Sequence, residues 1–292
     1  FDVVRGGNPP KRLLPDSTIA ESSTATGYVG TTSTGIELDG SGGGGGDTNV
    51  SGRTYVGWQW KANGAGVTNT AGSITSTVSA NATAGFSVVT YTGSASAGTV
   101  GHGLGVAPSM VIVKNRGAVT SWCVWHISIP GPTTGFINLD QTAGYSSNSI
   151  VFGAAPTSTV FSVGSYVGTN QNTLVAYCFA PISGYSAFGS YTGNGSTDGP
   201  FVYCGFRPRF VLVKDITNVT YWEIGDSSRN TYNAVDANLY PNSSTAEAAD
   251  TMFDFLSNGF KVRKAGGNFN NSGATTIYAA FAENPFTLSR AR

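Results

Sequence analysis

The sequence predicts an all-β protein made of tandem β-sandwich, jelly-roll-like repeats of about 100 residues, with minimal helix. One observation is a motif that occurs twice. Gly-Val-Ala-Pro-Ser-Met-Val-Ile-Val-Lys at 105–114 returns as Gly-Phe-Arg-Pro-Arg-Phe-Val-Leu-Val-Lys at 205–214, a shift of 100 (208 − 108). A second is the 40 glycines, which with asparagines separate short β-branched runs, as turns separate strands. A third is a 40% hydrophobic content with only 11% charged residues, which indicates a folded chain rather than a disordered one.

Each copy of the motif is a turn followed by a strand. Met110 and Ile112 would point to one face of that strand, and Val111 and Val113 to the other. Because both faces are apolar, we expect each strand to lie in the centre of its sheet and to be covered on both sides.

Further matches keep the same shift and then drift slightly. Tyr91-Thr92-Gly93 matches Tyr191-Thr192-Gly193, Trp122 matches Trp222, Asn138-Leu139 matches Asn238-Leu239, Phe161 matches Phe260, and Phe179 matches Phe281. A fixed framework with small drift in the loops is typical of a duplicated domain.

About seven strands are expected in each full repeat. They fall near 86–92, 109–115, 121–127, 134–139, 149–153, 159–165 and 173–180, with counterparts near 187–192, 208–214, 220–225, 236–240, 259–263 and 275–282. One short helix is expected between 244 and 258, because Ser244 to Glu247 has capping-box spacing and Asn258-Gly259 is a suitable helix stop.

The chain divides into a half unit and two repeats. Residues 1–62 match the second half of a repeat, residues 63–85 are expected to be a linker, and 86–181 and 182–292 are expected to be full β-sandwich repeats. The match rests on Leu14–Glu21 with Tyr240–Glu247, on Asp2 and Arg5 with Asp226 and Arg229, and on Trp60 with Phe179 and Phe281. Half a sandwich exposes an apolar face and unpaired edges. The chain also opens at Phe1 without an initiating Met, so we expect the missing half to lie upstream in a longer polypeptide or to come from a neighbouring subunit.

Composition argues against several classes of function. The net charge of +0 gives no broad field for nucleic acid or an anionic membrane. No run of about 18 apolar residues occurs, so no membrane insertion is expected. Cys123, Cys178 and Cys204 are too few and too scattered for a disulfide framework, and we interpret them as core filler.

Each residue able to do chemistry has a structural interpretation beside a functional one. His102 and His126 have no carboxylate or cysteine at ligand spacing, and position 202 is Val and 226 is Asp in the second repeat. Gly101, Gly103 and Gly105 precede a strand rather than a helix, which argues against a phosphate loop. Two carboxylate pairs, Glu223 with Asp226 and Asp250 with Asp254, could indicate glycoside hydrolysis, but we favour a structural Asp–Arg contact between Asp226 and Arg229. Asp39, Asp47 and Asn49 flank the glycine run, and we interpret them as a solvated loop rather than a cation site. We predict no catalytic, metal or cofactor-binding residue.

The aromatic residues have two possible interpretations. Trp58 and Trp60 lie two apart and share a face, whereas Trp122 and Trp125 do not. Aromatic platforms can stack on sugars, but the equivalence of Trp60 with two phenylalanines favours a core position. Near loops or strand ends, Tyr145, Tyr185, Tyr203 and Tyr232 could be exposed, and no ligand-binding residue is assigned among them.

Taken together these motifs resemble an uncharacterised repeat domain of structural proteins of tailed bacteriophages, especially those of marine bacteria and cyanobacteria. The resemblance rests on Gly-X-X-Pro-X-Met/Phe-Val-X-Val-Lys, the following Trp-containing strand, the Pro-Asn/Asp-Ser-X-X-Ala-Glu segment and closing strands such as residues 55–62 and 278–286. It implies a virion component without enzymatic activity: a tail fibre, tail appendage or head decoration with a possible role in host attachment.

We therefore expect a virion protein whose partners are copies of itself (an oligomer such as a trimer), other virion proteins and, for an attachment role, a host surface glycan. The alternative is a secreted, extracellular carbohydrate-binding module or adhesin, and a polysaccharide depolymerase is a third, weaker hypothesis. No nucleic acid partner is expected.

Overall fold

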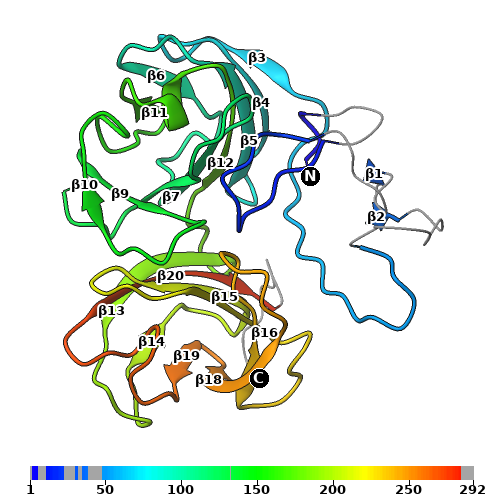
Figure 1. The fold of residues 1–292 in the computed structure, drawn as a ribbon, viewed down its shortest axis with the longest axis vertical. Helices are drawn as coiled ribbons and strands as arrows, with labels where there is room; N and C mark the ends of the chain where they lie inside the picture. The colour runs from blue at the N-terminus through cyan, green and yellow to red at the C-terminus, as the bar shows by residue number, and fades with distance from the viewer. Residues whose placement is uncertain are drawn as a thin grey trace.

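The computed structural model describes residues 2–5, 11–22, 30–31, 35–38, 48–131 and 133–283, and it confirms the all-β fold class. Two β-sandwiches, the first and second repeats, lie one above the other in Figure 1, and the N-terminal half unit runs beside them. The half unit carries two short paired strands, β1 (Gly30–Thr31) and β2 (Ile36–Glu37).

The first repeat contains ten strands and one four-residue helix among its described residues. These are β3 (Val67–Asn69), β4 (Ser76–Asn81), β5 (Phe86–Thr92), β6 (Gly98–Gly101), β7 (Met110–Asn115), β8 (Cys123–His126), β9 (Gly135–Asn138), β10 (Ser146–Ser147), β11 (Val160–Val163), α1 (Val167–Asn170) and β12 (Thr173–Phe179). One sheet has the order β10-β9-β8-β7-β12-β5-β4-β3, and β11 pairs with β6 opposite it.

The second repeat contains two four-stranded sheets. Its strands are β13 (Ser186–Thr192), β14 (Phe201–Tyr203), β15 (Pro208–Asp215), β16 (Trp222–Asp226), β17 (Val235–Asn238), β18 (Ala248–Leu256), β19 (Gly259–Val262) and β20 (Thr275–Ala282). The sheet orders are β13-β20-β15-β16 and β14-β19-β18-β17.

Each repeat contains four strands in the same arrangement, with the order β5-β12-β7-β8 in the first repeat and β13-β20-β15-β16 in the second. We call this the shared sheet of each repeat. In the second repeat, the first strand pairs with the last and the second with the seventh, as in a jelly roll. The third and fourth strands, β15 and β16, form a simple hairpin beside them.

The predicted central strands are central and buried on both faces. β7 lies between β8 and β12, and β15 lies between β16 and β20. Val111 and Val211 are both 0% exposed, which confirms that the two copies share an environment.

Each shared sheet separates two hydrophobic cores. On one face, Val111 and Val113 pack into the interior of the first sandwich, and Val211 and Val213 pack into that of the second. On the other face, residues of both shared sheets join a single third cluster, which we call the common core. Members of the common core include Leu13, Met110, Trp122, Phe179, Phe210, Trp222 and Phe281.

The expected linker is instead part of the first repeat. β3 and β4 both fall within 63–85, and β4 pairs along its whole length with β5. Val78 and Ile74 are buried in the first sandwich, so this Ser/Thr-rich segment carries enough apolar residues to extend the sheet.

The helix expected near 244–258 is wrong, because Ala248–Leu256 forms strand β18 paired with β17 and β19. Phe253 and Phe255 are both buried, with Asp254 less buried between them, which is a period of two. Glu247 bonds Arg229 rather than a helix start. The short helix α1 forms at 167–170 instead.

Two smaller expectations also change. Residues 149–153 form no strand, although Val151 and Phe152 are buried in the first sandwich. The expected match of Asn138-Leu139 with Asn238-Leu239 is displaced by two residues. Trp122 N bonds Asp140, and Trp222 N bonds Asn242 in the same way, so the shift here is 102 (242 − 140) rather than 100.

A buried asparagine braces the same loop in both repeats. The Asn170 side chain accepts from Ser94 N at 2.9 Å and donates to the carbonyls of Ser96 and Gly164. Asn270 repeats this pattern with Asn194 N, Ser196 O and Lys264 O. Neither asparagine is exposed, and these bonds satisfy backbone groups that the strands do not pair.

We predict that Asn170→Ala and Asn270→Ala each lower the free energy of unfolding by about 2–3 kcal/mol, because each leaves several buried backbone groups without a partner. Urea denaturation of the full chain measures this loss. The control is Ser158→Ala, at an exposed loop position, which should change stability by less than about 0.5 kcal/mol. Wild-type stability of Asn170→Ala would contradict the bracing role.

Candidate interaction site

The half unit reproduces a polar cluster of the second repeat. Arg5 Nη1 bonds Glu21 Oε2 at 2.9 Å, and Arg5 Nε bonds Asp2. Arg229 likewise bonds Glu247 at 2.8 Å and Asp226 at 2.7 Å. This confirms the predicted Asp–Arg contacts and shows that the half unit is folded in part like a repeat.

Asp2, His126 and Asp226 occupy equivalent positions in the three units, and each contacts the last strand or extended segment of the next unit. Tyr177 Oη bonds Asp2 Oδ2 at 2.8 Å, His126 Nε2 lies 3.1 Å from Tyr278 O, and Trp58 Nε1 bonds Asp226 Oδ2 at 3.2 Å. The half unit thus meets the first repeat, the first meets the second, and the second meets the half unit again. The three units therefore surround a common approximate three-fold axis.

Three equivalent aromatic side chains meet on that axis. The ring centroids of Trp60, Phe179 and Phe281 lie 5.4–5.9 Å apart, and all three pairs are edge-on. Edge-on pairs add about 0.5–1.5 kcal/mol beyond the burial of apolar surface. The sequence interpretation of these three positions as core is confirmed, although Trp60 is only partly buried.

A lysine and a tryptophan tie each full repeat to the unit before it. Trp122 Nε1 donates to Leu14 O at 2.8 Å, and Trp222 Nε1 donates to Asn138 O at 2.9 Å. The lysine contacts are equally repeated, with Lys114 Nζ to Thr18 O at 2.9 Å and Lys214 Nζ to Thr142 O at 3.0 Å. Burial lowers the pKa of each lysine from 10.5 to about 8.

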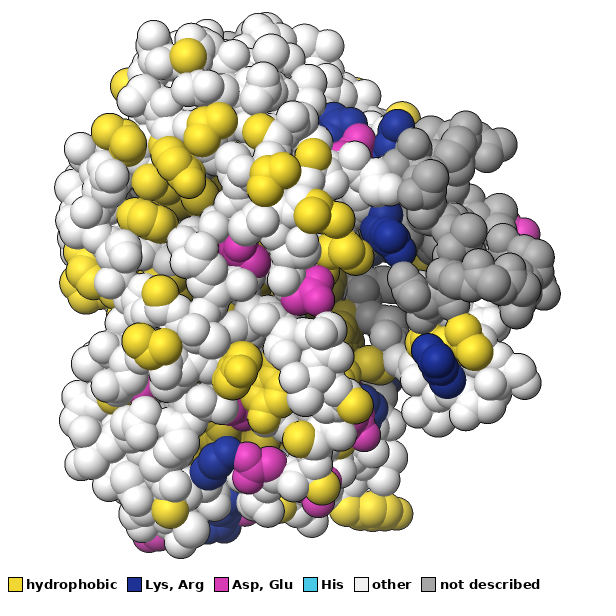
Figure 2. Space-filling view, viewed as in Figure 1, with side chains coloured by type: hydrophobic (Ala, Val, Ile, Leu, Met, Phe, Trp, Pro, Cys, Tyr) yellow, Lys and Arg dark blue, Asp and Glu magenta, His cyan; other side chains and the backbone are white. Residues whose placement is uncertain are grey.

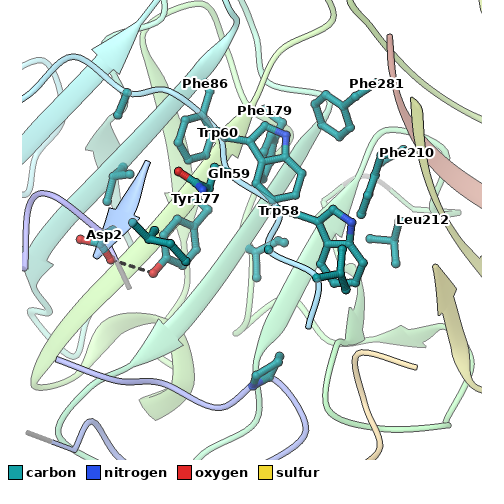
Figure 3. Close-up of a pocket in the computed structure, with 18 of the residues that line it drawn as sticks. Asp2, Trp58, Gln59, Trp60, Phe86, Tyr177, Phe179, Phe210, Leu212 and Phe281 are labelled. Atoms are coloured by element: carbon teal, nitrogen blue, oxygen red, sulfur yellow. Dashed lines mark hydrogen bonds between the residues drawn. The ribbon is translucent and has the colours of Figure 1, made fainter. Parts of the chain in front are cut away.

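A cavity of about 550 Å³ opens beside the aromatic centre. Trp58, Trp60, Phe210 and Phe281 all line it, with the tryptophan rings in edge-on contact with the phenylalanines, and Figure 3 shows the hydrogen bond from Tyr177 to Asp2 beside them. Its lining is mostly apolar. Such a cavity favours an apolar occupant over a sugar or an ion.

Residues 54–62 run past this cavity as an extended segment. Trp58, Trp60 and Ala62 are partly buried, and the residues between them are exposed, as in a strand with one covered face. Within the described residues, no backbone hydrogen bond joins 54–60 to another strand. The equivalent strands β12 and β20 are paired on both edges.

The two histidines are packed in neutral form rather than placed for catalysis. His126 Nδ1 accepts from Ser128 N, so its Nε2–H donates to Tyr278 O. His102 makes the same arrangement with Leu104 N and Thr157 O. Burial lowers the pKa of both, that of His126 to about 4.

The carboxylate pairs do not converge. Glu223 and Asp226 lie three apart on β16, so they point to opposite faces of the sheet. Burial raises the pKa of Glu223, whose oxygens accept from the amides of Asn268 and Asn238. Asp250 and Asp254 are each paired with a cation, Lys264 and Arg263.

The remaining predicted residues are scattered over the molecule. Asp39 and Asp47 lie outside the described residues, so the cation-loop alternative with Asn49 is not described. Trp122 and Trp125 enter different cores, as expected. Tyr145 and Tyr185 pack against the common core, whereas Tyr203 and Tyr232 are 68% and 84% exposed.

The cysteines are unpaired, and Cys123 and Cys178 are buried. Burial raises the pKa of all three thiols to about 12. Within the part of the chain that the structure describes, no three His, Cys, Asp or Glu side chains gather to hold a metal ion. Among the same residues, no helix has the length and apolar character needed to cross a bilayer.

Sequence reasoning missed the contacts between units. Lys114 and Lys214 stood in the repeated motif without an assigned role, yet a lysine that closes an apolar strand in both copies was a usable signal. The carbonyl acceptors, such as Leu14 O and Asn138 O, gave none, because every residue has a carbonyl group.

We predict that Trp60→Ala lowers the free energy of unfolding by about 2–3 kcal/mol, because it removes an aromatic ring from the centre of the three units. Trp60→Phe, the residue type of both equivalent positions, should cost about 1 kcal/mol or less. Urea denaturation compares the two, with exposed Tyr232→Ala as control. Equal losses for Ala and Phe would argue against a specific aromatic centre.

We predict that stability falls as the pH is lowered from about 6.5 to about 4, in part through His126. The folded protein keeps this ring neutral while the unfolded chain binds a proton, so unfolding becomes more favourable by on the order of 2–3 kcal/mol. Denaturation at several pH values measures the slope. His126→Asn, which can still accept from Ser128 N, should flatten it, and an unchanged slope would contradict this assignment.

The comparisons with known proteins give one match. Residues 1–285 match the family described as a domain of unknown function, DUF7483. No curated protein and no solved structure matches the chain. Because the family match extends over nearly the whole chain, this protein belongs to the DUF7483 family.

Proposed function

We propose that this chain is a non-enzymatic structural protein of a tailed-phage virion, a fibre, tail appendage or head decoration with a role in host attachment. The motifs that resemble phage structural repeats supply the biological setting. The observation that carries the proposal is geometric: three β units surround one axis through repeated contacts, as three subunits do in a symmetric assembly. A protein with three units around one axis fits the end or the side of an appendage that has three-fold symmetry.

The chemistry of the described residues supports a structural role. Asp2, Asp226 and Glu223 bind neighbouring side chains within the fold, and both lysines of the repeated motif join units to one another. On the face in Figure 2 charged side chains are few and scattered among uncharged polar ones. A surface of this kind keeps its contacts over a wide range of salt concentration, since few ion pairs can be screened.

The expected self-association remains a prediction and needs a face other than the common core. The described parts of the first repeat, the second repeat and the half unit cover much of one another there, and the cavity beside Trp60 stays open. Light scattering of the purified chain measures its oligomeric state directly.

The experiment that tests the proposal is mass spectrometry of purified particles combined with antibody labelling in electron microscopy. We expect the chain in the particles, with label at the tail or on the head surface. A chain found in the soluble fraction of infected cells and missing from the particles would refute the proposal.

A carbohydrate-binding module or adhesin is the second candidate, and the exposed Tyr203 and Tyr232 favour it. Exposed tyrosine rings can stack on sugars. Titration calorimetry against host-surface glycans should then show binding that Tyr203→Ala or Tyr232→Ala removes. Binding unaffected by either substitution would exclude these rings as the glycan contact.

A further inference from the structure

We propose that the exposed face of residues 54–62, with the cavity beside it, is a docking site for a third β half-unit. By half-unit we mean a polypeptide with the four strands and the lysine and tryptophan of residues 86–126. Docking of such a half-unit does not depend on the proposed virion role.

Among the described residues, the backbone of 54–60 makes no hydrogen bond to a neighbouring strand, unlike the strands equivalent to it. β12 lies between β5 and β7, and β20 lies between β13 and β15. Residues 54–62 occupy the equivalent place in the half unit, with Trp60 in line with Phe179 and Phe281 on the common axis. By this equivalence, residues 54–62 have room for two neighbouring strands, one on each edge of the segment.

In the half unit and in the first repeat, carbonyl groups bind the tryptophan and the lysine of the next unit. Leu14 O and Asn138 O each accept from a tryptophan of the next unit, and Thr18 O and Thr142 O each accept from its lysine. The equivalent groups of the second repeat are those of Tyr240 and Ser244, as the matching bonds of Asp140 and Asn242 to the two tryptophans establish. Among the described residues, no lysine or tryptophan reaches either carbonyl.

The cavity adjoins Trp60, whose equivalents each have an apolar partner on the neighbouring strand. Phe179 faces Met110 across the strand pair, and Phe281 faces Phe210. Trp60 faces no such partner within the described residues, and the cavity of about 550 Å³ lies on its open side. The occupant should carry a large apolar residue at the position of Met110 and Phe210.

Chemistry narrows the choice of occupant. A sugar or an ion fits a mostly apolar lining poorly, and a small apolar ligand leaves the backbone of 54–62 unpaired. A second copy of this chain is disfavoured because both of its half-units are already engaged in their own shared sheets. A separate half-unit satisfies the backbone, the two carbonyls and the cavity together, and its fourth strand would end beside Asp2, as β16 ends at Asp226.

The test joins a copy of residues 86–125 directly to Asp2. Asp2 then follows the added copy of β8 at the position that His126 holds in the first repeat. A matched control carries Lys114→Met and Trp122→Phe within the added copy only. Amide hydrogen exchange is followed at 54–62 in the unmodified chain, the fusion and the control. Thermal unfolding and the fluorescence of an apolar dye are measured in parallel.

In the fusion we expect exchange at 54–62 to slow by at least about tenfold, because these amides gain strand partners. We expect the unfolding temperature to rise by several degrees and dye fluorescence to fall. The control should lose part of each gain, since it keeps the strands and lacks the two donors.

Three results would overturn the inference. One is protection at 54–62 in the unmodified monomer equal to that of β12. Another is unchanged exchange at 54–62 in the fusion, whether or not the added segment is itself protected. The last is protection in the unmodified chain that increases with protein concentration together with dimer formation, which would make a second copy the occupant.

Discussion

Burial of each shared sheet on both faces is the constraint on which the rest of the structure depends. One face of β7 and of β15 fills the interior of its own sandwich, and the other face meets the common core. A repeat taken alone would expose Met110 and Trp122, or Phe210 and Trp222, to water. Burial of this surface between the units stabilises their association by about 25 cal/mol per Å² of apolar area.

The polar contacts then set how the units are arranged. Apolar burial is non-directional, so it would allow the sheets to slide over one another. The buried ammonium groups of Lys114 and Lys214 remove that freedom, because each must keep its carbonyl partners in the preceding unit or leave a buried charge without hydrogen bonds. The tryptophan Nε1 groups add a second fixed point on the same neighbour. This explains why a lysine closes an otherwise apolar strand in both repeats.

Much of the fold could be predicted from sequence because period-two patterning and the repeated motif are local signals. The central strands and the Asp226–Arg229 turn follow from them. The strand at Ala248–Leu256 was mistaken for a helix because the capping-box spacing was given more weight than the hairpin signal, although β18 pairs with β19 through a two-residue connection that is equally local. β3 and β4 were missed because Ser/Thr-rich segments resemble linkers until a neighbouring strand offers them an edge.

The site was less accessible to sequence reasoning, and for a related reason. Equivalence of Trp60, Phe179 and Phe281 was visible in the alignment of the units, but it indicated only that all three positions are alike. Convergence on one axis requires in addition that each unit present the same face to a shared centre, which the ring of contacts through Asp2, His126 and Asp226 establishes. Divergence at that ring is informative: the carboxylates accept from side chains of the next unit, whereas His126 donates to a backbone carbonyl. Each interface can therefore be tuned separately, which three identical subunits related by exact symmetry could not achieve.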